Sequence, residues 1–161
     1  MMRCRPAALL LAAASLVSCG GGKSAESEQE RHEREFSARM TGSVLVGKFT
    51  SNKSDKVHED RYTISKVSKM AGNIWVFQAR IQYGDHDVNV PVPVKLLWAG
   101  DTPVLTMTDA GVPGLGSFTV RLLFYRDEYA GTWSNNKGGG GQMFGRIERA
   151  AAPPESNAPT K

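Results

Sequence analysis

The chain has 161 residues, of which 40% are hydrophobic and 22% charged, and its formal net charge is +4. A chain of this length is expected to form one domain rather than several. So mild a positive excess gives no indication of nucleic-acid binding, and we expect no nucleic-acid partner.

The first 18 residues have the layout of an export signal. Arg3 and Arg5 form a basic start, about a dozen mostly apolar residues follow, and small residues end the segment. A membrane-spanning helix needs roughly 20 apolar residues. We therefore predict a signal peptide over residues 1–18 rather than a permanent transmembrane helix.

The end of this segment, Leu16-Val17-Ser18-Cys19, resembles the lipobox of bacterial lipoproteins. The resemblance implies that a diacylglyceryl group alkylates the Cys19 thiol, that a peptidase cleaves after Ser18, and that a fatty acid such as palmitate acylates the new amino group. Two or three acyl chains anchor a protein stably in a membrane. Gly20, in place of Asp, favours the outer membrane over the inner membrane. The alternative is an ordinary secretory signal whose cleavage site contains a cysteine.

Cleavage changes the composition of the chain. Cys4 leaves with the signal, and so do Arg3 and Arg5, which lowers the formal charge from +4 to +2. Because Cys19 would carry lipid, the mature protein would have no cysteine for a disulfide and would depend on its core. The expected location is the bacterial cell envelope, on the periplasmic side of a membrane.

Two polar segments flank the predicted domain. Residues 19–40 are expected to form a lipid-anchored tether, flexible or partly helical, because large apolar residues are nearly absent from it. Glu30 and Arg34, four residues apart, would support a solvated helix. Residues 150–161 are rich in proline and alanine and are expected to be disordered.

Residues 41–149 are predicted to form one all-β domain, because apolar and polar residues alternate along them. In 74–83, for example, one face carries Trp75, Phe77, Ala79 and Ile81. Short polar or glycine-containing connections favour an antiparallel meander, either a small up-and-down barrel or a strongly curled sheet. The eight predicted strands are 44–50, 61–67, 74–83, 87–98, 104–108, 117–125, 129–134 and 142–147.

Two prolines constrain the fourth predicted strand. Along an antiparallel strand the N–H groups of alternate residues point to the same neighbour, so Pro91 and Pro93 remove two donors on one side. We therefore expect an incompletely paired barrel, or an opening in the sheet beside this strand, where a ligand or partner could enter. The alternative is that the prolines only protect an edge from aggregation.

Eight short strands together with Gly131-Thr132-Trp133 resemble the calycins, the group that includes lipocalins and fatty-acid-binding proteins. In lipocalins the Gly-x-Trp motif lies on the first strand, whereas here it lies on the seventh predicted strand. The resemblance implies a lipocalin-like barrel over residues 41–149 that binds apolar molecules inside. Gly131 and Gly145 would allow close backbone approach at a bend.

A small eight-stranded barrel either fills with its own side chains or holds one small ligand. Trp133 in particular would serve as a core plug in a filled barrel. If the barrel instead holds a ligand, the candidate lining residues are Trp75, Phe77, Val90, Val92, Phe118, Val120, Leu122 and Trp133.

No pattern in the sequence indicates a reaction, and we expect neither an enzyme nor a cofactor. A nucleophile with a base and an orienting group is not evident. Asp85-His86-Asp87 and His58-Glu59-Asp60 are the best candidates for a metal site, but such residues are common in turns, and we predict no metal. The glycine run at 138–141 precedes a strand, which favours a hairpin loop over a phosphate site.

The sequence thus supports two functions of different kinds. The first is a non-catalytic structural or interaction module of the cell envelope, anchored to the membrane through Cys19, which would contact an envelope protein. The alternative is lipocalin-like binding of a small apolar molecule or lipid. The volume left inside the barrel would distinguish the two.

Overall fold

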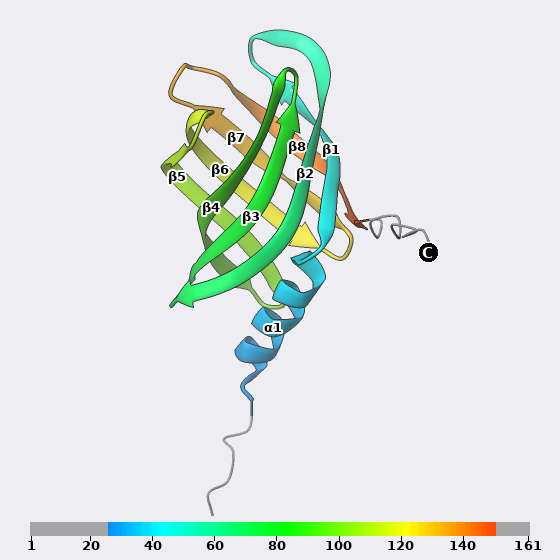
Figure 1. The fold of residues 1–161 in the computed structure, drawn as a ribbon, viewed down its shortest axis with the longest axis vertical. Coiled ribbons are helices and arrows are strands. Elements are labelled where there is room, and N and C mark those ends of the chain that lie inside the picture. The colour runs from blue at the N-terminus through cyan, green and yellow to red at the C-terminus, as the bar shows by residue number, and fades with distance from the viewer. Residues whose placement is uncertain (1–25, 151–161) are drawn as a thin grey trace, which may run out of the picture.

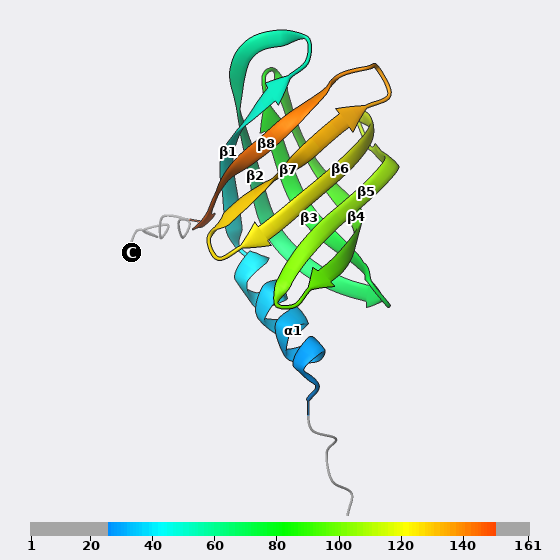
Figure 2. The ribbon, with the colours of Figure 1, turned by 180° about the vertical axis from the view of Figure 1, so that it is seen from behind.

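Eight antiparallel strands pair in chain order, and the first pairs with the last to close a barrel (Figure 1, Figure 2). The structure is a computed structural model and describes residues 26–150, so the predicted signal peptide, Cys19 and residues 151–161 of the tail lie outside the described residues. The predicted all-β meander is confirmed in the form of a barrel. Its elements are α1 (Glu28–Met40), β1 (Ser43–Ser51), β2 (Ser54–Ala71), β3 (Ile74–Tyr83), β4 (His86–Ala99), β5 (Thr102–Val112), β6 (Gly116–Tyr125), β7 (Glu128–Asn135) and β8 (Gly140–Arg149).

The predicted alternation is clearest in β3 and β4. In β3, Trp75 and Phe77 are buried, whereas Gln78 and Arg80 are exposed. In β4 the even-numbered residues from Val90 to Leu96 are buried and the residues between them are exposed. The apolar face of each strand points into the barrel, as expected for strands with one side in water.

β2 is longer than its predicted range of 61–67. Its register with β3 shifts between Ile64 and Lys66, which is a β-bulge. The inward positions therefore change from even numbers, such as Asp60, to odd numbers, such as Val67. The change of phase lies within the predicted range. Residues 54–57 and 69–71, at the two ends that the pattern missed, are exposed and show no alternation of buried and exposed positions.

The helix α1 begins with a capping box. The Glu30 N–H donates to the Ser27 hydroxyl at 3.2 Å, and the Ser27 N–H donates to the Glu30 carboxylate at 2.8 Å. Phe36 and Met40, four residues apart, share one face of the helix and are 3% and 0% exposed. Apart from the exposed Ala38 the rest of the helix is polar, and Phe36 and Met40 are its buried residues.

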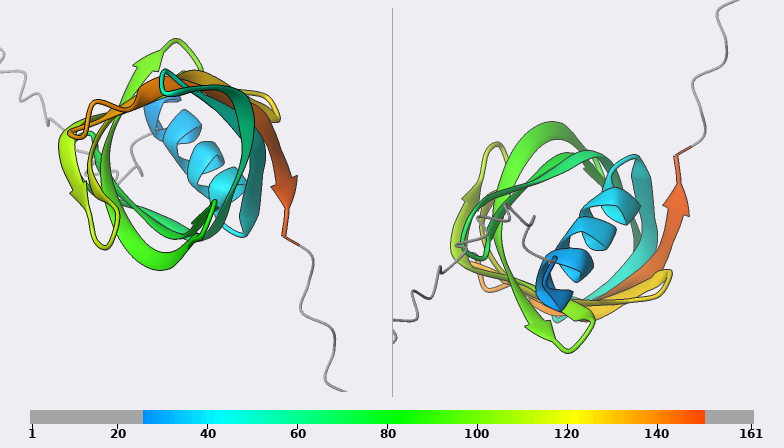
Figure 3. Two further views of the ribbon diagram at one scale, coloured as in Figure 1. Left: turned by 90° about the horizontal axis from the view of Figure 1, so that it is seen from above. Right: turned by 90° about the horizontal axis from the view of Figure 1, so that it is seen from below.

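Figure 3 shows α1 lying across one end of the barrel, which we call the lower end. The centroid of the Phe36 ring lies 5.6 to 6.3 Å from those of Trp75, Phe77, Trp98 and Phe124. The Ser37 hydroxyl also donates to the Val67 carbonyl at 2.9 Å. The sequence pattern predicted only a polar tether over residues 19–40 and did not predict this docking. Two apolar residues among so many charged ones give a weak signal.

The wall of the barrel is incompletely paired beside the two prolines. β3 pairs with β4 from Ile74↔Lys95 to Tyr83↔His86, but β4 pairs with β5 only over residues 95–99 and 102–106. The Leu96 N–H donates toward β3, to the Asn73 carbonyl at 2.9 Å, so the nitrogens of Pro91 and Pro93 face β5. The predicted opening is therefore present, as an unpaired stretch in the wall of a closed barrel.

We predict that Phe36→Ala destabilises the protein by about 3 kcal/mol, because it removes a buried ring from a cluster of four aromatic neighbours. Urea unfolding of the unanchored form, residues 20–161, measures the change. The matched control on the same helix is Glu35→Ala, at an exposed position, which is expected to change stability by less than about 0.5 kcal/mol. Equal midpoints for the two variants would show that α1 is not docked.

Candidate functional site

A cavity of about 210 Å³ lies inside the barrel. Its lining includes Phe49, Tyr83, Leu115 and Asn135, which lie at or next to the β1–β2, β3–β4, β5–β6 and β7–β8 connections. All four connections are at the end of the barrel opposite α1, which we call the upper end. No residue of α1 lines the cavity. The interior is thus divided into a packed lower part and a hollow upper part.

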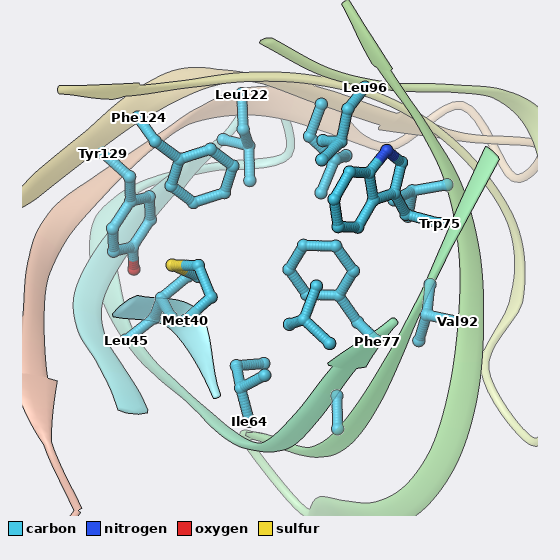
Figure 4. Close-up of a cluster of buried hydrophobic side chains, with 14 of the residues drawn as sticks. Met40, Leu45, Ile64, Trp75, Phe77, Val92, Leu96, Leu122, Phe124 and Tyr129 are labelled. Atoms are coloured by element: carbon cyan, nitrogen blue, oxygen red, sulfur yellow. The ribbon is translucent and has the colours of Figure 1, made fainter. Parts of the chain in front are cut away.

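The lower part is packed by large apolar side chains. Figure 4 shows Trp75, Phe77, Phe124 and Tyr129 converging with Met40 inside the barrel. Tyr129 and Met40 are among the largest fully buried side chains of the described residues. Phe77 and Phe124 also line the cavity, so they form the boundary between the packed lower part and the hollow upper part.

The cavity is apolar and carries no charge. None of its lining residues is Asp, Glu, Lys, Arg or His. Its polar groups are few, and two of them are satisfied within the wall. The Trp133 indole N–H donates to the Thr50 carbonyl at 3.1 Å, and the Asn135 side-chain oxygen accepts from the Lys137 and Gly139 N–H groups. Such a surface favours apolar molecules over polar ones.

Six of the eight candidate lining residues face the cavity, namely Phe77, Val92, Phe118, Val120, Leu122 and Trp133. The other two do not. Trp75 packs edge-on against Phe36, with ring centroids 6.3 Å apart, and so belongs to the contact with α1. Val90 is buried in the core without lining the cavity. Alternation identifies inward residues but does not show which of them meet a neighbour and which meet empty space.

The cavity lies behind the unpaired stretch of the wall. Val92 and Val94 of β4 line it on one side, and Met107 and Val112 of β5 line it on the other. These residues belong to the parts of β4 and β5 that do not pair with each other, which end at the Lys95↔Thr106 pair. No ladder of backbone hydrogen bonds joins the two strands here.

A buried polar row crosses the wall beside the cavity. In the register of the sheet, Tyr129 of β7 lies opposite Gly145, Gly145 opposite Gly47, Gly47 opposite Asp60, and Asp60 opposite Tyr83. The Tyr129 side chain extends over the two glycines, and its hydroxyl donates to Asp60 at 3.2 Å. A Cβ at position 47 would lie 2.0 Å from the Tyr129 hydroxyl, so glycine is required there.

Asp60 is 4% exposed and accepts a second hydrogen bond, at 3.1 Å, from the hydroxyl of Tyr62. Burial raises the pKa of Asp60, and the hydrogen bonds from Tyr62 and Tyr129 oppose that rise. Burial and the neighbouring carboxylate both raise the pKa of Tyr129 and of Tyr62. Both tyrosines are therefore protonated donors at neutral pH.

This row was not predicted from the sequence. The predicted strand 61–67 began one residue after Asp60, which was instead grouped with His58 and Glu59 as a polar turn. The available signal was the spacing of Asp60, Tyr62 and Ile64, which share one face of β2. The expected close approach at glycines is confirmed, since a Cβ at Gly131 would lie 1.8 Å from the Arg121 carbonyl oxygen.

The remaining sequence candidates have other contacts. Both carboxylate oxygens of Asp87 accept hydrogen bonds from the guanidinium of Arg80, at 2.7 and 2.6 Å, and this pairing lowers the pKa of Asp87. Within residues 26–150 no three His, Cys, Asp or Glu side chains are grouped to hold a metal ion. No helix in this part of the chain is long and apolar enough to span a membrane.

Comparisons with protein-family models, with curated proteins and with solved structures found no match to the chain. The closed meander of eight strands is compatible with a small lipocalin-like barrel.

Proposed function

We propose that the protein is a non-catalytic, lipid-anchored protein of the bacterial cell envelope whose barrel binds a small apolar molecule. The observation that carries the proposal is the uncharged cavity of about 210 Å³ inside a barrel that is otherwise packed. An engineered apolar cavity of about 150 Å³ holds benzene, whereas drug-sized sites begin near 300 Å³. The cavity therefore suits a single ring or a short alkyl chain.

The unpaired stretch between β4 and β5 offers a small apolar ligand an entrance through the wall. β4 and β5 are unpaired next to the cavity, so they separate without the loss of backbone hydrogen bonds. Pro91 and Pro93, which have no N–H to offer to β5, keep this stretch from closing into a ladder. The lower end is covered by α1, which leaves the unpaired stretch and the upper end as routes to the interior.

A homologous series of n-alcohols tests the cavity. We expect the affinity of the unanchored form, measured by isothermal titration calorimetry, to rise about fourfold for each added CH₂, since burying one contributes about 0.8 kcal/mol. The affinity should stop rising once the chain fills the available volume. An increase that continued without a limit, or no binding by any member, would contradict a bounded internal site.

The matched variants are Ala79→Leu and Gln78→Leu. The Ala79 side chain lines the cavity, so a leucine there occupies the space of the ligand. Gln78 is its neighbour on β3 and is exposed on the outer face. We expect Ala79→Leu to abolish binding of the longer alcohols and Gln78→Leu to leave it unchanged.

The membrane anchor rests on the resemblance of residues 16–19 to a lipobox. We expect the full chain, expressed in a bacterial host grown with an alkyne-labelled palmitate, to take up the label and to fractionate with membranes. Cys19→Ser should lose both the label and the membrane association. The control is Cys4→Ser, which lies within the predicted signal and should retain both. A labelled Cys19→Ser variant would contradict lipidation at this residue.

A second candidate function, an interaction module, is favoured by an apolar row on the outside of the barrel. Leu97 lies opposite Val104, Val104 opposite Leu123, Leu123 opposite Ala130, and Ala130 opposite Phe144, across β4 to β8. Leu97, Leu123 and Phe144 are each more than 40% exposed. These strands lie side by side on the face seen in Figure 2. An exposed apolar row of this kind is a feature of protein-binding surfaces.

Photo-crosslinking tests the outer row. A photoreactive residue at position 123 is expected to give one discrete adduct in intact cells if this row contacts an envelope protein. The control is position 121, also exposed and two residues away on β6. Identical patterns from the two positions would remove the support for this second function.

A further inference from the structure

We propose that Asp60 is the polar end of the ligand site and that the natural ligand is a small apolar amine, whose ammonium group pairs with this carboxylate. The inference rests on the proposed function, since it names the class of molecule that the cavity binds. It starts from a buried carboxyl group, Asp60, to which residues 26–150 supply no cationic partner.

The first observation is that Asp60 has no cationic partner among the described residues. At 4% exposure it is as buried as the apolar core around it. Its two hydrogen bonds come from neutral hydroxyls, those of Tyr62 and Tyr129. The salt bridges of residues 26–150 all involve other acidic residues. Buried carboxylates are costly unless they are paired, and in folded proteins the partner is usually a cation.

The second observation is that the neighbours of Asp60 line the cavity, although Asp60 itself does not. Tyr62, which donates to it, lines the cavity, and so does Tyr83, which lies opposite it in the register of β3. Across β1, Leu45 and Phe49 line the cavity on either side of Gly47, the residue paired with Asp60. The carboxylate is thus one side chain away from the space that a ligand would occupy.

The third observation is that the carboxylate has acceptor capacity left. An ionised carboxyl group has about four lone-pair sites, and the two tyrosines occupy one on each oxygen. A ligand ammonium would take another of these sites with a charge-assisted hydrogen bond, either directly or after a shift of the Tyr62 hydroxyl. No covalent step is involved.

The same geometry excludes the opposite class of ligand. A fatty-acid carboxylate would bring a second negative charge toward Asp60, and no Lys or Arg among residues 26–150 lines the cavity to compensate for it. Like charges brought together in a site with few water molecules repel strongly. The site therefore discriminates by charge among molecules of equal size, with amines preferred, neutral alcohols tolerated and carboxylates rejected.

Three ligands with the same chain test the inference, namely n-hexylamine, n-hexanol and hexanoate at pH 7, titrated into the unanchored form by calorimetry. We expect hexylamine to bind at least about tenfold more tightly than hexanol, which is the usual size of a hydrogen bond to a charged group. Hexanoate should bind more weakly than hexanol. Hexanoate binding as tight as that of hexylamine would overturn the proposal.

Two variants test whether Asp60 causes the preference for hexylamine over hexanol. Asp60→Asn should reduce the affinity for hexylamine to that for hexanol while leaving hexanol binding within about twofold, because the cavity itself is unchanged. If Asp60→Asn fails to fold, acidification of the wild-type protein provides the second test, because the preference for hexylamine over hexanol should fall as the Asp60 carboxylate is protonated. The control is Glu59→Gln, an exposed acid beside Asp60 on β2, which should behave as the wild type does. A preference that survives Asp60→Asn would overturn the assignment.

The outcomes separate the two proposals. If none of the three molecules binds, the proposed function fails. If hexanol binds and the amine is not preferred, the cavity is a ligand site and only the assignment of Asp60 fails.

Discussion

The limited interior of an eight-stranded barrel is the constraint on which this structure depends. A barrel of this size has room for its own inward side chains and little else. Here the lower part is filled by large residues and by Phe36 and Met40, which α1 inserts from outside the sheet. The cavity lies above this packed end, and no residue of α1 lines it. The barrel thus has a packed end, where α1 docks, and a hollow end.

Strand β4 determines where the wall of the barrel is unpaired, and that unpaired part lies beside the cavity. The chain must cross from β4 to β5 to close the barrel, yet Pro91 and Pro93 cannot donate toward β5. Closure is consequently confined to residues 95–99 and 102–106, and apolar side chains of both strands line the cavity beside the unpaired rest of this boundary. A sequence feature that weakens the sheet thus lies where a ligand would need access.

Much of the fold follows from local pattern, and much of the site does not. Alternation along 74–83 and 87–98 identifies strands and their inward faces, and the two prolines predict the unpaired stretch. The docking of α1 was missed because the partners of Phe36 are four aromatic rings distant in the sequence, which no pattern within the helix reveals. Asp60 was missed because a charged residue at an inward position contradicts the pattern that identifies strands. The volume of the cavity depends on packing between residues distant in the chain, which no local pattern contains.

The most direct test of the central claim is native mass spectrometry of the unanchored form, secreted to the periplasm of a bacterial host behind a cleavable signal and purified without detergent. A barrel that binds a small molecule in its cavity should carry a discrete added mass that is lost on denaturation, and Ala79→Leu should reduce that adduct. If repeated preparations of the wild type and the variant show only the mass of the protein without a ligand, ligand binding is contradicted as the function. That result would favour the outer apolar row as a surface that binds a protein partner.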